Sequence, residues 1–152
     1  MMRKVLFVCI HNSARSQMAE AFTNALCGDH ALARSAGLEP GVLNPLVVEV
    51  MREIGIDLSG KETRAVFDVY KRGERFDDVV TVCDEASAER CPVFPGVANR
   101  LHWSFPDPSS FQGSWEERLE QTRGVRDAIR ARVAHWCAEI AGRTEDERAA
   151  TT

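Results

Sequence analysis

The stretch KVLFVCIHNSARSQMAEAF, residues 4–22, changes its hydrophobic period halfway along. Residues 5–8 form a continuous apolar run, which is typical of a central strand buried on both faces. From Ala14 onward, apolar residues recur at helical spacing up to a helix stop at Gly28: Met18, Ala21, Phe22, Ala25 and Leu26. The stretch therefore predicts a strand, a short loop and an amphipathic helix in succession.

The rest of the first half continues this alternation. Residues 30–35 are short enough for a second strand, which leads to a turn at Gly37. Asn44 followed by Pro45 is typical of an N-cap and the first residue of a helix. We expect that helix to run through Ile54 and to end at Gly55.

The second half predicts two further strands and a long helix. The strands are expected at residues 78–82 and 99–103. Ser114 to Glu117 is a capping box, which marks the start of the helix. Its arginines are expected to decorate mainly the solvent side, opposite an apolar stripe of Trp115, Leu119, Val125, Ile129, Val133, Trp136 and Ile140.

Strands alternating with helices predict an α/β fold, a single domain with a four-stranded parallel sheet flanked by helices. We expect this domain to span residues 1–142 and the polar tail, residues 143–152, to be disordered. In such sheets ligands bind outside the carboxyl ends of the strands. Cys9 follows the first strand, Cys83 the third and Asp107 the fourth, so we expect these three residues to meet at one edge.

Charge and hydrophobicity exclude several classes of protein. The net charge of -4 argues against nucleic-acid binding, which is usually accompanied by a basic excess. No apolar run approaches the roughly 20 residues that cross a bilayer. The apolar run behind Arg3 and Lys4 is short and lacks a small-residue cleavage site, so we expect a cytoplasmic protein without a membrane partner.

The chain has five cysteines, and in an unexported protein we expect them to be reduced thiols. The odd count and the wide spacing argue against a disulfide framework. There is no Cys-x2-Cys and no Cys/His cluster with zinc-like spacing, so no metal site is expected.

The loop between the first strand and the first helix predicts an oxyanion site. A loop that leads into a helix N-terminus presents N–H groups and the positive end of the helix dipole, which also favours a nucleophilic thiolate. Asn12 tolerates the left-handed backbone that a sharp turn needs, Arg15 offers a bidentate grip on an oxyanion, and Ser16 can donate to the Cys9 sulfur. The predicted oxyanion-binding residues are Ile10, His11, Asn12, Ser13, Ala14, Arg15 and Ser16.

The same Cys-x5-Arg spacing occurs a second time, at Cys137 and Arg143. Here the cysteine lies beside Trp136 on the apolar stripe of the long helix, where no loop is available, so we expect a core or interface thiol. Cys27, at the end of the first helix, is likewise expected to be structural.

The motif VCIHNSARSQMAEAF resembles the phosphate loop and first helix of the low-molecular-weight protein tyrosine phosphatase superfamily. This resemblance implies a flavodoxin-like topology and nucleophilic attack by Cys9. It also implies that Asp107, which precedes Pro108, is the general acid.

The stretch VVTVCDEASAERCPVFPGVANRLHWSFPDPSS, residues 79–110, resembles the thioredoxin-coupled arsenate reductases, as do RSAGLEP and NPLVVEVMREIGIDLSG. The likeness covers roughly residues 4–140. It implies that Cys9 attacks arsenate, that Cys83 then forms a disulfide with Cys9, and that Cys91 attacks Cys83 to carry the disulfide outward. Thioredoxin would reduce that disulfide, no cofactor would be bound, and phosphate or sulfate would act as analogues of arsenate.

Several points depart from the family pattern or stay open. Seven residues separate Cys83 from Cys91, one more than we expect. Some relatives bind potassium with residues that match Asn12, Glu20 and Ser35 and an aspartate that would fall near Arg64, whose charge argues against such a site. The sequence does not identify the thiol donor or the oligomeric state.

Two other functions remain open at this stage. One is a low-molecular-weight protein tyrosine phosphatase whose extra cysteines protect Cys9 from oxidation, and the other is a non-enzymatic oxyanion or redox sensor. Ser109 and Ser110 stand after Asp107-Pro108, where the phosphatases usually carry aromatic residues, and they favour a small inorganic substrate.

Overall fold

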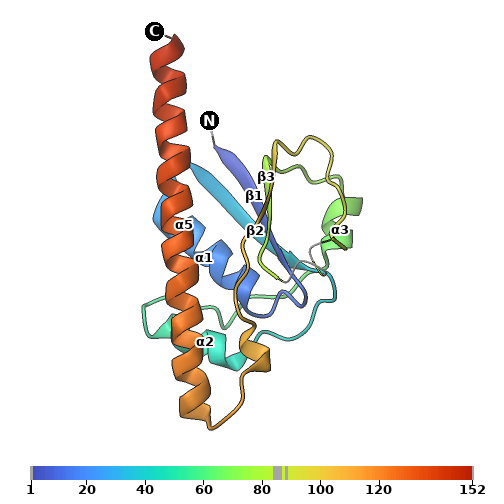
Figure 1. Ribbon diagram of the computed structural model, residues 1–152. Coiled ribbons are helices and arrows are strands. Elements are labelled where there is room, and N and C mark those ends of the chain that lie inside the picture. Colours follow the sequence, from blue (N-terminus) through green and yellow to red (C-terminus); the bar gives the residue numbers. More distant parts are fainter. Residues whose placement is uncertain (1, 84–86, 88, 152) are drawn as a thin grey trace.

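The computed structural model describes residues 2–83, 87 and 89–151, with side chains described as far as residue 142. It contains a four-stranded sheet in which all neighbouring strands are parallel (Figure 1). The spatial order is β2-β1-β3-β4, which confirms the predicted fold class. The strands are β1 (Arg3–Cys9), β2 (Ala31–Gly37), β3 (Asp78–Thr81) and β4 (Asn99–His102).

Helices flank this sheet on both sides, with α1 and α5 on one side and α3 on the other (Figure 1). The short helix α3 follows α2 in the chain and was not predicted from the sequence. The helices are α1 (Arg15–Cys27), α2 (Pro45–Arg52), α3 (Val66–Lys71), a 3-10 turn (Pro108–Ser110) and α5 (Trp115–Thr151).

The central strand β1 packs on both faces, as its continuous apolar run predicted. Val5, Phe7 and Cys9 belong to the core beneath α1, α2 and α5. Leu6 and Val8 belong to a second core, which includes residues of α3. Because successive side chains alternate between faces, all five must be apolar for both layers to form.

The two predicted N-terminal helix caps are confirmed, whereas α2 ends at Arg52 and not at Ile54 as predicted. Asn44 Oδ1 accepts a hydrogen bond from the Leu46 backbone N–H at 2.9 Å, with Pro45 as the first helical residue. Ser114 Oγ accepts from the Glu117 N–H at 3.1 Å, and Glu117 Oε1 accepts from the Ser114 N–H at 3.4 Å. These reciprocal bonds satisfy donors that a helix start leaves without intrahelical partners.

The predicted apolar faces of α1 and α5 are partly wrong. Ala25, Leu26 and Trp115 are exposed, although their spacing placed them on buried faces. Cys27, the last residue of α1, takes the inward position at that end of the helix instead. The backbone of α5 continues as a helix to Thr151, where the sequence predicted a disordered tail at residues 143–152.

Cys27 and Cys137 form a disulfide with a Cα–Cα distance of 5.8 Å. The expectation that all five cysteines are reduced, and that these two are separate structural thiols, was therefore wrong. The physical reason is that α1 packs along α5 and places the end of one helix beside the buried face of the other (Figure 1). A sequence separation of 110 residues gave no local signal of this contact.

Candidate active site

Cys9 is the last residue of β1, and its side chain is held at the start of a tight loop. Its Sγ lies 2.8 Å from Ser16 Oγ and accepts a hydrogen bond from the Asn12 backbone N–H at 3.2 Å. Asn12 has a φ of 54°, the left-handed conformation that its residue type predicted. The loop therefore wraps around the sulfur and places the Asn12 N–H and the Ser16 hydroxyl against it.

The carbonyl groups of the loop are occupied by the segment that follows β2. The carbonyls of Cys9, Ile10, His11 and Ser13 accept hydrogen bonds from backbone N–H groups within residues 38–44, at 2.7–3.1 Å. These bonds matter because carbonyl oxygens directed into the loop would repel an anion.

Gly37 permits this close approach. A Cβ at Gly37 would lie only 2.7 Å from the backbone nitrogen of Asn12, nearer than real Cβ contacts allow. The glycine is therefore required where β2 meets the loop, a requirement that the sequence interpretation did not identify.

Arg15 opens α1 and reaches from the loop toward the segment that follows β4. Arg15 is 5% exposed, and its guanidinium group donates to the Phe105 carbonyl at 3.2 Å and lies 3.6 Å from Asp107 Oδ2. Its Nε is buried, with no hydrogen-bond partner in the described part of the chain. The contact with Phe105 was not predicted, because nothing in the sequence marks a carbonyl as a partner for Arg15.

Asp107 lies past β4 with its carboxyl group partly exposed. Besides its contact with Arg15, the carboxylate accepts a hydrogen bond from the Ser109 N–H at 2.9 Å. Of the three residues predicted to meet at the strand ends, Asp107 contacts the loop that begins at Cys9 through Arg15.

Cys83 lies two residues beyond the end of β3, the strand that pairs with the strand of Cys9. The Val82 N–H donates to the Val8 carbonyl at 2.8 Å, so the two strands stay paired up to their cysteines. Both cysteines are buried and reduced, and they belong to the same core. The predicted convergence of these two thiols at one sheet edge agrees with this packing.

Cys91 is in a different environment. It packs in the core on the other face of the sheet, beside residues of α3, and its Sγ donates a weak hydrogen bond to the Pro92 carbonyl. Burial raises the pKa of the Cys91 thiol to about 11, although the charge of Arg100 opposes this effect. Residues 84–86 and 88 of the intervening segment DEASAER lie outside the described residues.

The residues that match the potassium site of some relatives do not fit a potassium ion here. Glu20 is buried, and its Oε1 accepts from Ser35 Oγ at 3.4 Å, but its Oε2 lies 2.8 Å from the ammonium nitrogen of Lys61. Asn12 Oδ1 already accepts from the Arg64 N–H at 3.0 Å. Arg34, Arg64 and Arg72 line the same hollow and would repel a further cation.

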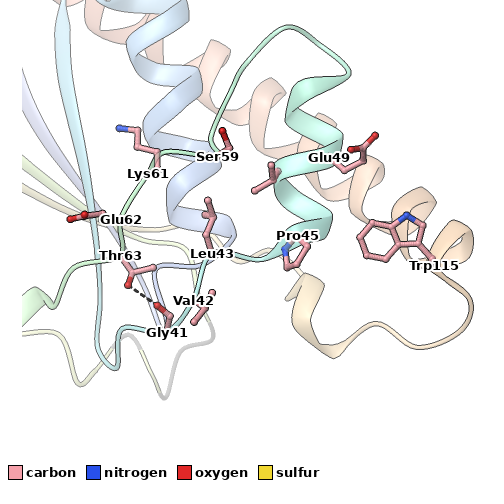
Figure 2. Close-up of a pocket in the computed structure, with 11 residues that line it drawn as sticks. Gly41, Val42, Leu43, Pro45, Glu49, Ser59, Lys61, Glu62, Thr63 and Trp115 are labelled. Carbon is pink, nitrogen blue, oxygen red and sulfur yellow. Dashed lines mark hydrogen bonds between the residues drawn. The ribbon is translucent and has the colours of Figure 1, made fainter.

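A separate cavity of about 820 Å³ lies beside the loop and contains none of the predicted site residues (Figure 2). Leu43 and Pro45 face it from one side and Trp115 stands at its far end, while a hydrogen bond from Thr63 Oγ1 to the Gly41 carbonyl closes another side.

In the described part of the chain, no helix is both long and apolar enough to cross a membrane.

The fold and the loop together define a class: α/β proteins that carry a cysteine in an oxyanion loop at the end of the first strand. The family model described as "Low molecular weight phosphotyrosine protein phosphatase" matches residues 4–146. The chain therefore belongs to this family, as its loop motif indicated.

The similar proteins include arsenate reductases. The arsenate reductase of Shouchella clausii is 41% identical over 135 residues, which cover 88% of this chain and 94% of that protein. A solved arsenate reductase in the phosphate-binding state has a TM-score of 0.75 at 31% identity, covering 91% of this chain and 99% of that one. The thioredoxin-dependent arsenate reductase of Corynebacterium glutamicum has a TM-score of 0.58 at 29% identity, covering 87% of this chain and 62% of that one.

Proposed function

We propose that this protein reduces arsenate to arsenite, with Cys9 as the nucleophile and Cys83 and Cys91 as a disulfide relay that thioredoxin recycles. The observation that carries the proposal is the surroundings of Cys9: the Asn12 N–H and the Ser16 hydroxyl at its sulfur, the buried Arg15 in the same loop and a second buried thiol in the same core. The arsenate reductases among its relatives support the choice of substrate.

In the first step the loop holds arsenate and the Cys9 thiolate attacks arsenic. The loop N–H groups and Arg15 balance the charge of the tetrahedral oxyanion. An arsenate oxygen leaves as water after Asp107, whose carboxyl group lies 3.6 Å from the Arg15 guanidinium, supplies a proton. The product is an adduct in which Cys9 sulfur is bonded to pentavalent arsenic.

In the second step the Cys83 thiolate attacks the Cys9 sulfur. A sulfur–sulfur bond forms, the sulfur–arsenic bond breaks, and its electron pair stays on arsenic, which leaves as trivalent arsenite. The two electrons come from the Cys9 and Cys83 sulfurs, which end as a disulfide. The shared core of Cys9 and Cys83 supports this order of attack, because Cys91 packs on the other face.

In the third step Cys91 attacks the Cys83 sulfur and releases the Cys9 thiolate. A dithiol donor then reduces the Cys83–Cys91 disulfide, so that turnover needs no bound cofactor. Burial and the raised pKa of Cys91 keep this thiol unreactive in the present conformation, so its segment must move first. Thioredoxin is the donor we propose, because a similar solved structure is of a thioredoxin-dependent arsenate reductase.

A second candidate activity is hydrolysis of phosphate monoesters, since the family model is that of phosphotyrosine phosphatases. Cys9, Arg15 and Asp107 would serve that reaction equally well, with water in place of Cys83. Ser109 and Ser110 are exposed and offer no aromatic wall to a phosphotyrosine ring, which favours the small inorganic substrate.

The test is to measure arsenate-dependent NADPH oxidation by the purified protein in the presence of thioredoxin and thioredoxin reductase. We expect turnover with wild-type protein, and loss of turnover in Cys83→Ser with aryl-phosphate hydrolysis retained. Parallel reactions with glutaredoxin or glutathione identify the donor. Efficient phosphotyrosine hydrolysis without arsenate reduction would establish the phosphatase instead.

A further inference from the structure

Gln17, the third residue of α1, is buried beneath the oxyanion loop and donates hydrogen bonds that the proposed mechanism does not use. Its side chain is 1% exposed. Its Nε2 lies 3.1 Å from the Asn12 carbonyl oxygen, 3.3 Å from Asn12 Oδ1 and 3.2 Å from the Glu62 carbonyl oxygen. One amide group therefore connects the loop to the segment that runs behind it.

Asn12 is the residue through which the loop contacts the Cys9 sulfur. Its backbone N–H donates to Cys9 Sγ, and its Nδ2 donates at 2.8 Å to Ser16 Oγ, which itself lies 2.8 Å from that sulfur. Both contacts depend on the left-handed backbone of Asn12, which costs free energy for a residue other than glycine. Bonds that hold Asn12 in this conformation therefore act on Cys9.

We propose that Gln17 is a positioning residue, whose amide group locks Asn12 so that two donors stay directed at the Cys9 sulfur. Nε2 shares its two hydrogens among three acceptors, of which two, the backbone carbonyl and the side-chain oxygen, belong to Asn12. The Arg64 N–H also bonds the Asn12 side-chain oxygen, whereas Gln17 is the contact that engages the Asn12 carbonyl as well. The effect on Cys9 reactivity follows from geometry alone, whereas its consequence for arsenate turnover rests on the proposed function.

The buried side-chain oxygen of Gln17 indicates that this position requires the N–H donors of the amide group. Gln17 Oε1 is buried, with no hydrogen-bond partner among the described residues, and burying such an acceptor is unfavourable. An unbranched apolar side chain of similar length would fill the same space without that penalty. The position therefore favours glutamine for the bonds that Nε2 makes.

The test compares Gln17→Met with Thr23→Val, a matched change on the same helix. Thr23 is fully buried, and among the described residues its hydroxyl donates to the Ala19 carbonyl, one turn back in α1. The readout is the rate of Cys9 alkylation by iodoacetamide between pH 4 and pH 9, followed by mass spectrometry of the Cys9 peptide. Thermal unfolding of both variants measures any loss of stability separately.

We expect Gln17→Met to move the midpoint of the alkylation profile upward by about half a pH unit or more, because the thiolate loses well-directed donors. Thr23→Val should leave the midpoint unchanged, even if it lowers the melting temperature as much. An unchanged midpoint in Gln17→Met, or an equal shift in both variants, would overturn the assignment.

A second variant, Asn12→Gly, removes the Asn12 side chain at a backbone conformation that glycine adopts readily. It should shift the midpoint in the same direction, and the double variant with Gln17→Met should shift it by less than the sum of the single effects. A Gln17→Met effect of the same size in both backgrounds would contradict action through Asn12. Alkylation requires no arsenate, so these results stand even if the protein proves not to reduce arsenate.

Discussion

The chain contains two segments with identical Cys-x5-Arg spacing, and the structure gives them different backbones. Residues 9–15 leave a buried strand, turn through a left-handed Asn12 and enter a helix. Residues 137–143 lie within the continuous helix α5, where Cys137 is bonded to Cys27. The spacing alone therefore carries no chemistry, because only the strand–loop–helix path places backbone donors at the sulfur.

The comparison also separates two roles for cysteine in one protein. Cys9, Cys83 and Cys91 are reduced, and Cys9 and Cys83 follow paired strands at their carboxyl ends. Cys27 and Cys137 instead join α1 to α5 along the helical layer. If this division is correct, substitutions in the first group should alter turnover and substitutions in the second should alter stability.

The largest expected effect is on turnover. Cys9→Ser should lower arsenate-dependent NADPH oxidation by about a thousandfold or more, because the hydroxyl of serine is a far weaker nucleophile than a thiolate. Cys137→Ser, the matched change in the second segment, should keep most of the activity. A comparable loss in both variants, with both proteins folded, would remove the distinction between the segments.

The second effect is on stability. Cys137→Ala should lower the free energy of unfolding by about 2–4 kcal/mol in urea without reductant, since the disulfide closes a long loop in the unfolded chain. In dithiothreitol the wild-type protein loses the same bond, so the difference between the two proteins should shrink. A difference that reductant leaves unchanged would mean that packing, and not the disulfide, stabilises this contact.

The third effect compares the arginines that end the two Cys-x5-Arg segments, Arg15 and Arg143. Arg15→Lys should lower kcat/KM for arsenate by about a hundredfold, because lysine lacks the planar fork that grips an oxyanion and cannot also reach the Phe105 carbonyl. Arg143→Lys in α5 is the control and should change kcat/KM little. Steady-state kinetics with the thioredoxin couple would measure both.

The fourth effect concerns the pH dependence of Cys91. Because burial raises its pKa from 9.0 to about 11, the folded protein holds this proton more tightly than the unfolded chain. The resulting stabilisation is present below about pH 9 and is lost as the pH rises toward 11. Alkylation of Cys91 at pH 9 should therefore be about fiftyfold slower in the native protein than in urea; equal rates would show that its segment is open.

The smallest effect concerns the ion pair between Lys61 and Glu20, beside the oxyanion loop. Lys61→Met should lower the free energy of unfolding by about 1 kcal/mol, because it leaves the buried Glu20 carboxylate without its ammonium partner, although Lys61 itself is 45% exposed. Arg90→Met, which breaks the more exposed pair with Glu39, is the control and should have almost no effect. Urea unfolding at low and high salt would compare them, and equal losses would contradict a special role for Lys61.

Local sequence patterns predicted much of the fold because the signals lie within a few residues of each other. The Asn44-Pro45 start of α2 and the capping box of α5 depend on short-range bonds, and both are present. The apolar run of β1 is a signal carried by consecutive residues, although the strand itself is held by distant partners. The parallel order then followed from the alternation of strands and helices. The loop residue Asn12 was also predictable, since its left-handed backbone is a property of residue type.

What the sequence missed depends on contacts between distant segments. The Cys27–Cys137 disulfide, the Phe105 carbonyl at Arg15 and the required glycine at position 37 all arise where separate elements meet. Trp115 follows the periodicity of α5 but lies at its exposed first turn, beyond the layer that the helix covers. Periodicity gives the direction of a side chain on its own helix and does not say where the neighbouring element ends.

The central claim is that Cys9, Cys83 and Cys91 act in sequence, and one measurement tests it most directly. Protein with these three cysteines reduced is mixed with arsenate in the absence of any thiol donor, and its disulfides are mapped by mass spectrometry of alkylated peptides. The proposed relay predicts a Cys83–Cys91 disulfide in the wild-type protein and a Cys9–Cys83 disulfide in Cys91→Ser, each with one arsenite released. Three thiols that stay reduced after exposure to arsenate would contradict it.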